Sequence, residues 1–438
     1  MKWFAILALV MCPAGAAQAA VIRVPLDEPT IQAGLDAATS GDAVLLAPGT
    51  YRGQGNIDLS FEGKAVTLLS ERGPASCVID CDGNGRAFWF HNNETSASVV
   101  RGITIREGFA NVGGAISCEF ASPTIADCRF TGNEAGNGAA IFLWGASPEI
   151  VNSLIAGNYA SFRGGGIDCG QIDDPSCPRI VNCTITGNEA DTYGGGVFVT
   201  ISDPVFSGCI LWGNEPEDIY IMSGTPAVDH STVTGGYPGA GNLSGDPRFV
   251  SGPGGDYYLS HVTAGQPADS PCIDAGHLAA YAICLSSTSA EWCLDQLTTS
   301  SGDSRDTGQV DQGYHHYAAP GPLELDLVLT KEQPQCFRPD NHFVLEVRTG
   351  NPLPVTDGDL YCVLDVYGVY FFHPSWTQDL QAEILSIPAG AGSNTVLDFT
   401  WPMGAGAADD LAFYAVLTEH ASFDLLSKVD VAWFCYSE

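Results

Sequence analysis

The residues of this 438-residue chain that could do chemistry gather in one short stretch. They are two arginines and three aspartates: Arg163, Asp168, Asp173, Asp174 and Arg179. Two carboxylates facing one sugar across ~5–9.5 Å would hydrolyse a glycosidic bond, whereas an arginine with a depressed pKa would serve as the base of a lyase. The stretch carries no motif of either enzyme class, and solvated loop residues or ordinary salt bridges explain it more simply. The catalytic residues are therefore left unassigned, with these five as candidates, and a non-catalytic protein is favoured.

Three tryptophans are candidates for ligand contact, because sugars stack on exposed aromatic rings. Alternation along Phe88-Trp89-Phe90 would bury the two phenylalanines and expose Trp89 on the other face. Trp144 and Trp212 occupy strand-and-corner positions in their own repeats. Core packing is the alternative explanation for all three.

The sequence predicts no metal site and no cofactor. The neighbouring histidines His315 and His316 would point to opposite faces of a strand, although Asp306 and Asp311 lie nearby. The aspartate-rich segment 80–85 is typical of calcium ligands but lacks the EF-hand spacing, so calcium is kept only as an alternative. Arg129, in an alternating stretch, should point outward if Cys128 points inward, and could line a groove near Asp168.

These residues must be positioned by a repeat. A glycine-rich corner followed by an apolar residue recurs with steps of 25, 26 and 30 residues, at Ile116, Ile141, Ile167 and Val197. A period in the twenties with two-residue alternation and no amphipathic helix predicts stacked coils of short parallel strands. One insertion of a few residues is expected within 170–178.

Two structural ladders should run along the stacked coils. The first consists of asparagines that each follow a corner glycine, at Asn133, Asn158, Asn188 and Asn214. Such asparagines tolerate left-handed backbone angles and can hydrogen-bond from one coil to the next. The second ladder contains small buried side chains, at Cys128, Ser153, Cys183 and Cys209. A disulfide is geometrically possible only for the last pair, because the other cysteines are two coils apart.

The Gly-Gly-Ala-Ile and Phe-Thr-Gly-Asn markers resemble the repeats of bacterial polymorphic outer-membrane proteins. The stretch from Pro29 to Gly53 resembles the opening of pectin-lyase-like right-handed β-helix proteins, which implies a capping helix at about 31–38. Segments within 245–276 resemble those that close such helices. The resemblance implies an all-β protein with a right-handed, single-stranded parallel β-helix over 21–318. It implies no particular activity, because this fold serves many functions.

The two ends of the chain differ from the repeat region. Residues 1–19 are typical of a signal peptide, with a short apolar run and an Ala-Gln-Ala cleavage site. After a linker at 319–322, irregular alternating runs over 323–438 predict a small β-sandwich. The 14 cysteines left after removal of Cys12 fit disulfides in an exported protein.

The charge narrows the range of partners. With 51 acidic and 17 basic residues the net charge is −34, which disfavours nucleic acid and anionic membranes. No apolar run approaches the length of a transmembrane helix. The sequence therefore predicts a secreted or cell-surface protein, with the periplasm not excluded. A polysaccharide or cell-surface glycan is the expected partner, and an adhesive role is compatible. A polysaccharide lyase or glycoside hydrolase acting in the solenoid groove is the alternative.

Overall fold

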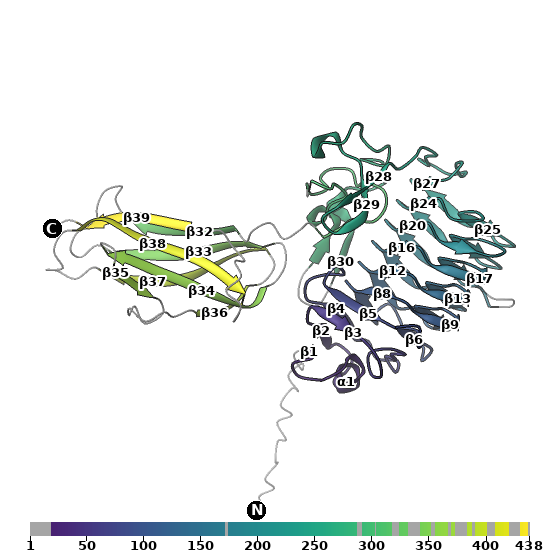
Figure 1. The fold of residues 1–438 in the computed structure, drawn as a ribbon, viewed down its shortest axis with the longest axis horizontal. Coiled ribbons are helices and arrows are strands. Elements are labelled where there is room, and N and C mark those ends of the chain that lie inside the picture. Colours follow the sequence, from purple (N-terminus) through teal and green to yellow (C-terminus); the bar gives the residue numbers. More distant parts are fainter. Residues whose placement is uncertain are drawn as a thin grey trace, which may run out of the picture.

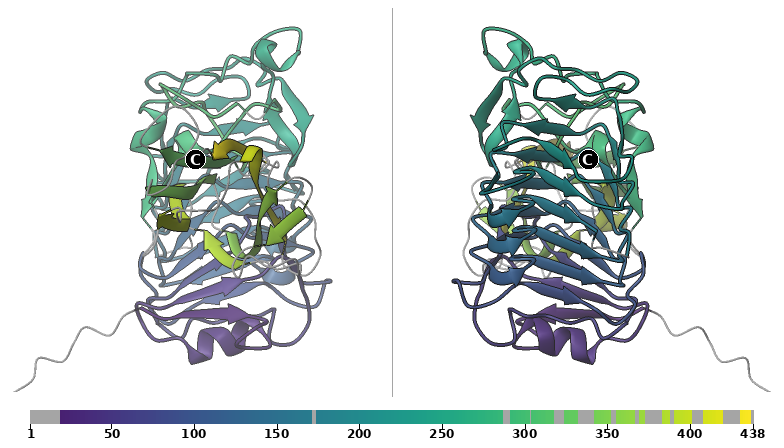
Figure 2. Two further views of the ribbon diagram at one scale, coloured as in Figure 1. Left: turned by 90° about the vertical axis from the view of Figure 1, so that its left-hand side faces the viewer. Right: turned by 90° about the vertical axis from the view of Figure 1, so that its right-hand side faces the viewer.

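The computed structural model describes residues 19–317, except 171–173, 287–290 and 303, and eight strand segments between 324 and 436. The predicted signal peptide, apart from its last residue, lies outside the described residues. Residues 21–233 form an all-β solenoid of stacked coils (Figures 1 and 2), whose successive coils pair in parallel. In the described part of the chain, no helix is long and apolar enough to cross a membrane.

Four parallel sheets run along the solenoid. The nine-stranded sheet contains β1 (Val21–Val24), β2 (Ala43–Leu46), β4 (Thr67–Ser70), β7 (Val99–Arg101), β11 (Thr124–Ala126), β15 (Glu149–Val151), β19 (Arg179–Val181), β23 (Val205–Ser207) and β26 (Ala227–Asp229). The eight-stranded sheet contains β3 (Gly49–Tyr51), β5 (Cys77–Asp80), β8 (Thr104–Arg106), β12 (Arg129–Thr131), β16 (Leu154–Ala156), β20 (Thr184–Thr186), β24 (Ile210–Trp212) and β27 (Thr232–Val233).

The remaining two sheets complete each coil. The four-stranded sheet contains β9 (Phe109–Val112), β13 (Glu134–Asn137), β17 (Tyr159–Arg163) and β21 (Glu189–Ala190). The six-stranded sheet contains β6 (Phe88–Phe90), β10 (Ile116–Glu119), β14 (Ile141–Trp144), β18 (Ile167–Cys169), β22 (Val197–Val199) and β25 (Ile219–Ile221).

The sequence repeat and the strand register coincide. Ile116, Ile141, Ile167 and Val197 are register partners in neighbouring coils, and all four are buried in one continuous core. Alternation sends the residues between the core positions to the outside of each sheet. The corner glycines are needed because a Cβ at Gly113, whose φ is 60°, would collide with the carbonyl oxygen of Ile116. The insertion falls between β18 and β19, where the chain takes nine residues from Cys169 to reach Arg179.

A short helix, α1 (Ile31–Ala37), covers the N-terminal end of the solenoid (Figure 2). Thr30 caps it, with its hydroxyl accepting a hydrogen bond from the Ala33 amide at 3.3 Å. Ile31, Leu35 and Ala38 are all buried, so one face of this segment closes the apolar core.

The asparagine ladder is continuous through four coils. Each side-chain amide donates to the next side-chain oxygen, from Asn133 to Asn158 at 2.9 Å, to Asn188 at 2.8 Å and to Asn214 at 2.9 Å. Asp218 ends the ladder by accepting from Asn214 at 2.8 Å. All of these side chains are buried, so the ladder satisfies backbone and side-chain groups that water cannot reach.

The small-residue ladder is also present, and it contains no disulfide. The Cys128 amide donates to Ser153 Oγ at 3.3 Å, and the Ser153 amide donates to Cys183 Sγ at 3.4 Å. Cys183 and Cys209 occupy adjacent coils as free thiols, so the bridge that the sequence allowed there is not formed. Elsewhere Cys293 is disulfide-bonded; it faces Cys284 in register across a hairpin.

Thiol labelling should separate the surface cysteine from the ladder. Burial raises the pKa of the Cys183 thiol well above its usual value, whereas Cys177 is exposed. Because the thiolate is the nucleophile, iodoacetamide should modify Cys177 in the native protein and Cys128, Cys183 and Cys209 only after unfolding. Peptide mapping by mass spectrometry checks this, with Cys177→Ser as the control. Native labelling of Cys183 would contradict the buried ladder.

The chain after the last coil folds back over the eight-stranded sheet. This closing region contains β28 (Phe249–Gly252), β29 (Gly255–Leu259), η1 (Val262–Ala264), η2 (Ala280–Ala282), β30 (Cys284–Ser286), β31 (Glu291–Cys293) and η3 (Leu294–Gln296). It ends in residues 311–317, here called the closing strap, which run back along the solenoid axis. The strap contacts one coil after another, through Asn182 to the Asp311 carbonyl at 2.8 Å and through Asn152 to the His315 amide at 2.6 Å.

Beyond residue 323 the described segments are antiparallel strands. One sheet contains β32 (Glu324–Lys331), β33 (His342–Asn351) and β37 (Gly390–Thr400). The other contains β35 (Val369–Phe372), β34 (Val355–Val366), β38 (Ala408–Glu419) and β39 (Asp430–Tyr436), with β36 (Glu383–Ile387) paired to β34. The predicted linker at 319–322 lies outside the described residues.

Candidate functional site

The outer face of the six-stranded sheet presents one side chain per coil at a single register position. Successive coils are ~4.8 Å apart, and this column contains four aromatic and two polar residues, in the order Trp89, Ser117, Phe142, Asp168, Phe198 and Tyr220. A second outward position carries Glu119 beside Trp144 in the next coil. Trp89 and Trp144 are exposed on this face, whereas Ser117, Phe142, Asp168 and Phe198 are buried.

Asp168 is the one charged residue of this column, and it is fully buried. Its Oδ2 accepts a hydrogen bond from Arg163 Nε at 2.9 Å, whereas its Oδ1 has no partner. Burial raises the pKa of Asp168 to about 7, although the Arg163 guanidinium opposes the shift. Arg163 in turn lies 4.3 Å from the ring centre of Phe198. The Arg163–Asp168 pair is therefore packed against Phe198 and has little contact with solvent.

Asp174 and Arg179, two of the other predicted catalytic candidates, have partners outside this pair. Asp174 Oδ2 accepts from Trp144 Nε1 at 2.9 Å, and Arg179 Nη1 donates to Glu149 on the nine-stranded sheet at 2.5 Å. Asp173 lies outside the described residues. The described members of the predicted cluster are therefore divided among separate contacts.

The neighbours of Asp168 within the column are aromatic. In the described part of this sheet, the residues beside Asp168 in the adjacent coils are Phe142 and Phe198, so no second carboxylate flanks it in register. Hydrolysis needs such a pair. Arg163 is ion-paired with Asp168, so its guanidinium group already has a partner.

Two of the three tryptophan candidates lie together on the six-stranded sheet. The side chains of Trp89 and Trp144 are 42% and 37% exposed. Trp212 instead lies on the eight-stranded sheet, packed with Ile210, Leu259 and Cys272. The closing region covers that sheet and partly buries Trp212, so ligand contact at Trp212 stays a prediction that this packing disfavours.

Sequence reasoning missed two residues next to these tryptophans. Phe120 follows β10, is 53% exposed and lies 5.5 Å from Trp144 between ring centres. Glu119 accepts hydrogen bonds from Trp89 Nε1 and Ser117 Oγ, both at 3.1 Å. Trp89, Glu119, Phe120, Trp144 and Asp174 are here called the aromatic face. The sequence could have indicated that Glu119 lies beside Trp144, because each stands three residues after the apolar anchor of its own repeat.

Arg129 points out of the eight-stranded sheet, but it cannot line a groove beside Asp168. It donates to the Gly254 carbonyl at 2.6 Å and to the Tyr314 hydroxyl at 3.1 Å, and it contacts His316 Nδ1 at 3.1 Å. The closing region thus buries it on a different sheet. Burial and the nearby Arg129 charge also hold the pKa of His316 well below its usual value.

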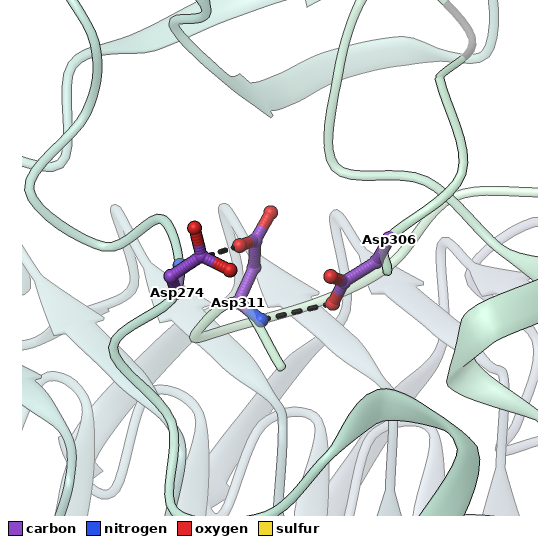
Figure 3. Close-up of side chains that lie close together, drawn as sticks. All are labelled: Asp274, Asp306 and Asp311. Carbon is purple, nitrogen blue, oxygen red and sulfur yellow. Dashed lines mark hydrogen bonds between the residues drawn. The ribbon is translucent and has the colours of Figure 1, made fainter. Parts of the chain in front are cut away.

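A group of three aspartates lies in the closing region (Figure 3). One oxygen of each of Asp274, Asp306 and Asp311 falls within 4.8 Å of the others. Asp306 Oδ2 accepts from the Asp311 amide at 2.9 Å and contacts His315 Nε2 at 2.7 Å, while Asp311 accepts from the Asp274 amide and from Thr299. Burial, and then the Asp306 charge, raise the pKa of Asp311. The contacts of Asp306 and Asp311 hold the closing region together.

The aspartate-rich segment 80–85 uses its buried carboxylate for ion pairs. Asp80 Oδ2 lies 2.6 Å from Arg52 Nη2 and 2.9 Å from Arg106 Nη2. These two guanidinium groups balance the negative charge of that carboxylate.

One comparison with known protein families agrees with this architecture. A family model described as a right handed beta helix region matches residues 82–236. The solenoid is thus a right-handed parallel β-helix. Among solved structures, pectate lyase Pel9A is similar at 14% sequence identity and a TM-score of 0.28, over 68% of this chain and 98% of that chain. No curated protein matches the chain.

Proposed function

We propose that this chain is an exported, non-catalytic β-helix protein that binds carbohydrate on the aromatic face. The observation that carries the proposal is the exposure of Trp89, Phe120 and Trp144 on one face in three consecutive coils. Rings spaced at ~4.8 Å per coil can contact successive sugars of an extended glycan. The indole nitrogens of both tryptophans are held by carboxylates, so the rings are oriented before a ligand arrives.

Absence of catalysis is supported by the contacts of the candidate residues. Asp168 pairs with Arg163, Asp174 with Trp144, and Arg179 with Glu149. None of these pairs is aimed at a common point. The alternative, a lyase or hydrolase working in the groove, requires a convergent acid and base. Reducing-end release and formation of unsaturated products, measured on the glycans used for binding, decide between the two. Turnover on any of them would overturn the non-catalytic proposal.

Export and the C-terminal region belong to the same proposal. Residues 1–19 have the composition of a signal peptide, which favours a secreted or cell-surface location. Two antiparallel groups of strands within 324–436 are what a β-sandwich would contain. An adhesive surface protein resembling the polymorphic outer-membrane repeats is compatible with both features.

Removing the Trp144 ring should weaken glycan binding. We expect Trp144→Ala to lower affinity about tenfold, because an aromatic contact contributes about 1 kcal/mol beyond its buried area. Affinity gel electrophoresis over neutral, amino and uronate polysaccharides measures this. Phe109→Ala is the matched control, since that ring is 54% exposed but lies on the four-stranded sheet. Equal binding by Trp144→Ala and the wild type would place the glycan elsewhere.

A further inference from the structure

The two tryptophans of the aromatic face differ in what covers their rings. Trp89 stacks on His91, with ring centres 4.0 Å apart and planes 21° from parallel, and the Arg86 guanidinium carbon lies 5.7 Å from its centre. Trp144 contacts only Phe120 among the described aromatic rings, at a tilt of 47°. Both rings are exposed to a glycan, but a cation already lies near Trp89, so Trp144 is the ring left for a cation of the ligand.

Carboxylates stand on both sides of Trp144. Asp174 Oδ2 accepts from its Nε1 at 2.9 Å, and Glu119 is its register partner in the preceding coil. Within the described part of the chain, neither carboxylate forms a salt bridge. Arg86 lies over Trp89 and interacts electrostatically with Glu119, so the charge of Glu119 is partly offset, whereas Arg179 is ion-paired with Glu149. Asp174 therefore gives Trp144 a neighbouring negative charge that no salt bridge offsets in the described part of the chain, and Glu119 adds a second, partly offset one.

A ligand cation matches this environment. The face of an indole ring attracts ammonium groups, and tryptophan does so best among the aromatic side chains. The two carboxylates supply the opposite charge at the same place, and the net charge of −34 draws cations toward the molecule over a longer range. The same charges repel a uronate polymer. Resting on the proposed carbohydrate-binding function, we propose that the site at Trp144, Glu119 and Asp174 selects a glycan that carries protonated amino groups.

The choice of a glycan over a basic peptide follows from the exposed rings. A lysine-rich peptide would be attracted by the overall charge alone and would not need Phe120 and Trp144 in adjacent coils. An amino-sugar polymer uses both features, because its apolar sugar faces can lie on the rings while its ammonium groups lie beside the carboxylates.

The experiment compares glucosamine oligomers, N-acetylglucosamine oligomers of the same length and oligogalacturonate by calorimetry at pH 5.5. We expect the glucosamine oligomer to bind at least tenfold tighter than the acetylated one, with the difference shrinking as salt is raised. Glu119→Gln and Asp174→Asn keep an oxygen acceptor for the indole nitrogens but remove the charge. Each should reduce the preference several-fold, whereas Glu189→Gln, at an exposed residue of the four-stranded sheet, should leave it unchanged.

The outcomes separate the inference from the function on which it rests. Equal binding of the two oligomers would overturn the amino-sugar inference and leave carbohydrate binding intact. Failure of every glycan to bind would overturn both. If polylysine binds as tightly as the glucosamine oligomer and both are indifferent to the two substitutions, the attraction belongs to the net charge and the inference is wrong.

Discussion

Replacing Asn188 by alanine is expected to destabilise the solenoid by about 3–5 kcal/mol. The buried side chain accepts from the Asn158 amide and side chain at 3.1 and 2.8 Å. It also donates to the Ile155 carbonyl and to Asn214, both at 2.9 Å. Alanine leaves these groups without that partner in a place that water does not reach. The free energy of unfolding from urea titration measures the loss.

The control for this substitution is Asn84→Ala. Asn84 is exposed and its side chain donates to the Asp82 carbonyl at 2.7 Å, so its removal should cost less than about 1 kcal/mol. If the two variants lose similar stability, the ladder at Asn188 contributes no more than a surface turn does. That result would contradict the role assigned to the ladder.

The stability of the protein should depend on the ionisation of Asp168. Burial raises its folded-state pKa to about 7, from about 3.9 in an unfolded chain, despite the opposing charge of Arg163. The folded state therefore holds the proton more tightly, and the stability present below pH 4 is lost as the pH rises through about 7. The loss is on the order of 4 kcal/mol for a shift of this size.

Asp168→Asn removes this titration. The free energy of unfolding of the variant minus that of the wild type should increase by several kcal/mol as the pH rises from 4 to 7.5. Urea titrations across that range measure the difference, and comparison with the wild type cancels the other carboxylates. The exposed Asp191→Asn serves as the control and should run parallel to the wild type. A difference that does not change with pH would show that Asp168 keeps its charge in the folded protein.

The repeat could be predicted from the sequence because its causes are local. A corner glycine at Gly113 and a ladder asparagine at Asn188 are dictated by the backbone conformation of their own coil, so their spacing shows directly. The inward positions follow from alternation in the same way. The outer surface could not be predicted at this level, because what covers a strand comes from elsewhere in the chain.

Arg129 and Trp212 illustrate the limit. Both occupy outward strand positions, yet Arg129 binds Gly254, which lies 125 residues later in the chain, and Trp212 packs with Leu259. Nothing near either residue in the sequence indicates that cover. The closing region does not cover Trp144, because it folds over the eight-stranded sheet rather than the six-stranded one. The candidate site was therefore found only in part, and its carboxylate at Glu119 was found from the register of β10 and β14.

The closing strap restricts how this solenoid can change in length. Repeat proteins ordinarily gain or lose units freely, because each repeat contacts only its neighbours. Here the strap meets coils in fixed order, with the Gly313 amide on Gly208 at 2.7 Å, Tyr314 on Thr184 at 2.9 Å and Tyr317 on Asp127 at 3.3 Å. A coil duplicated between Asp127 and Gly208 would move every later contact out of alignment. The strap thus fixes the number of repeats that it spans. That part of the molecule can change length only if the strap changes with it.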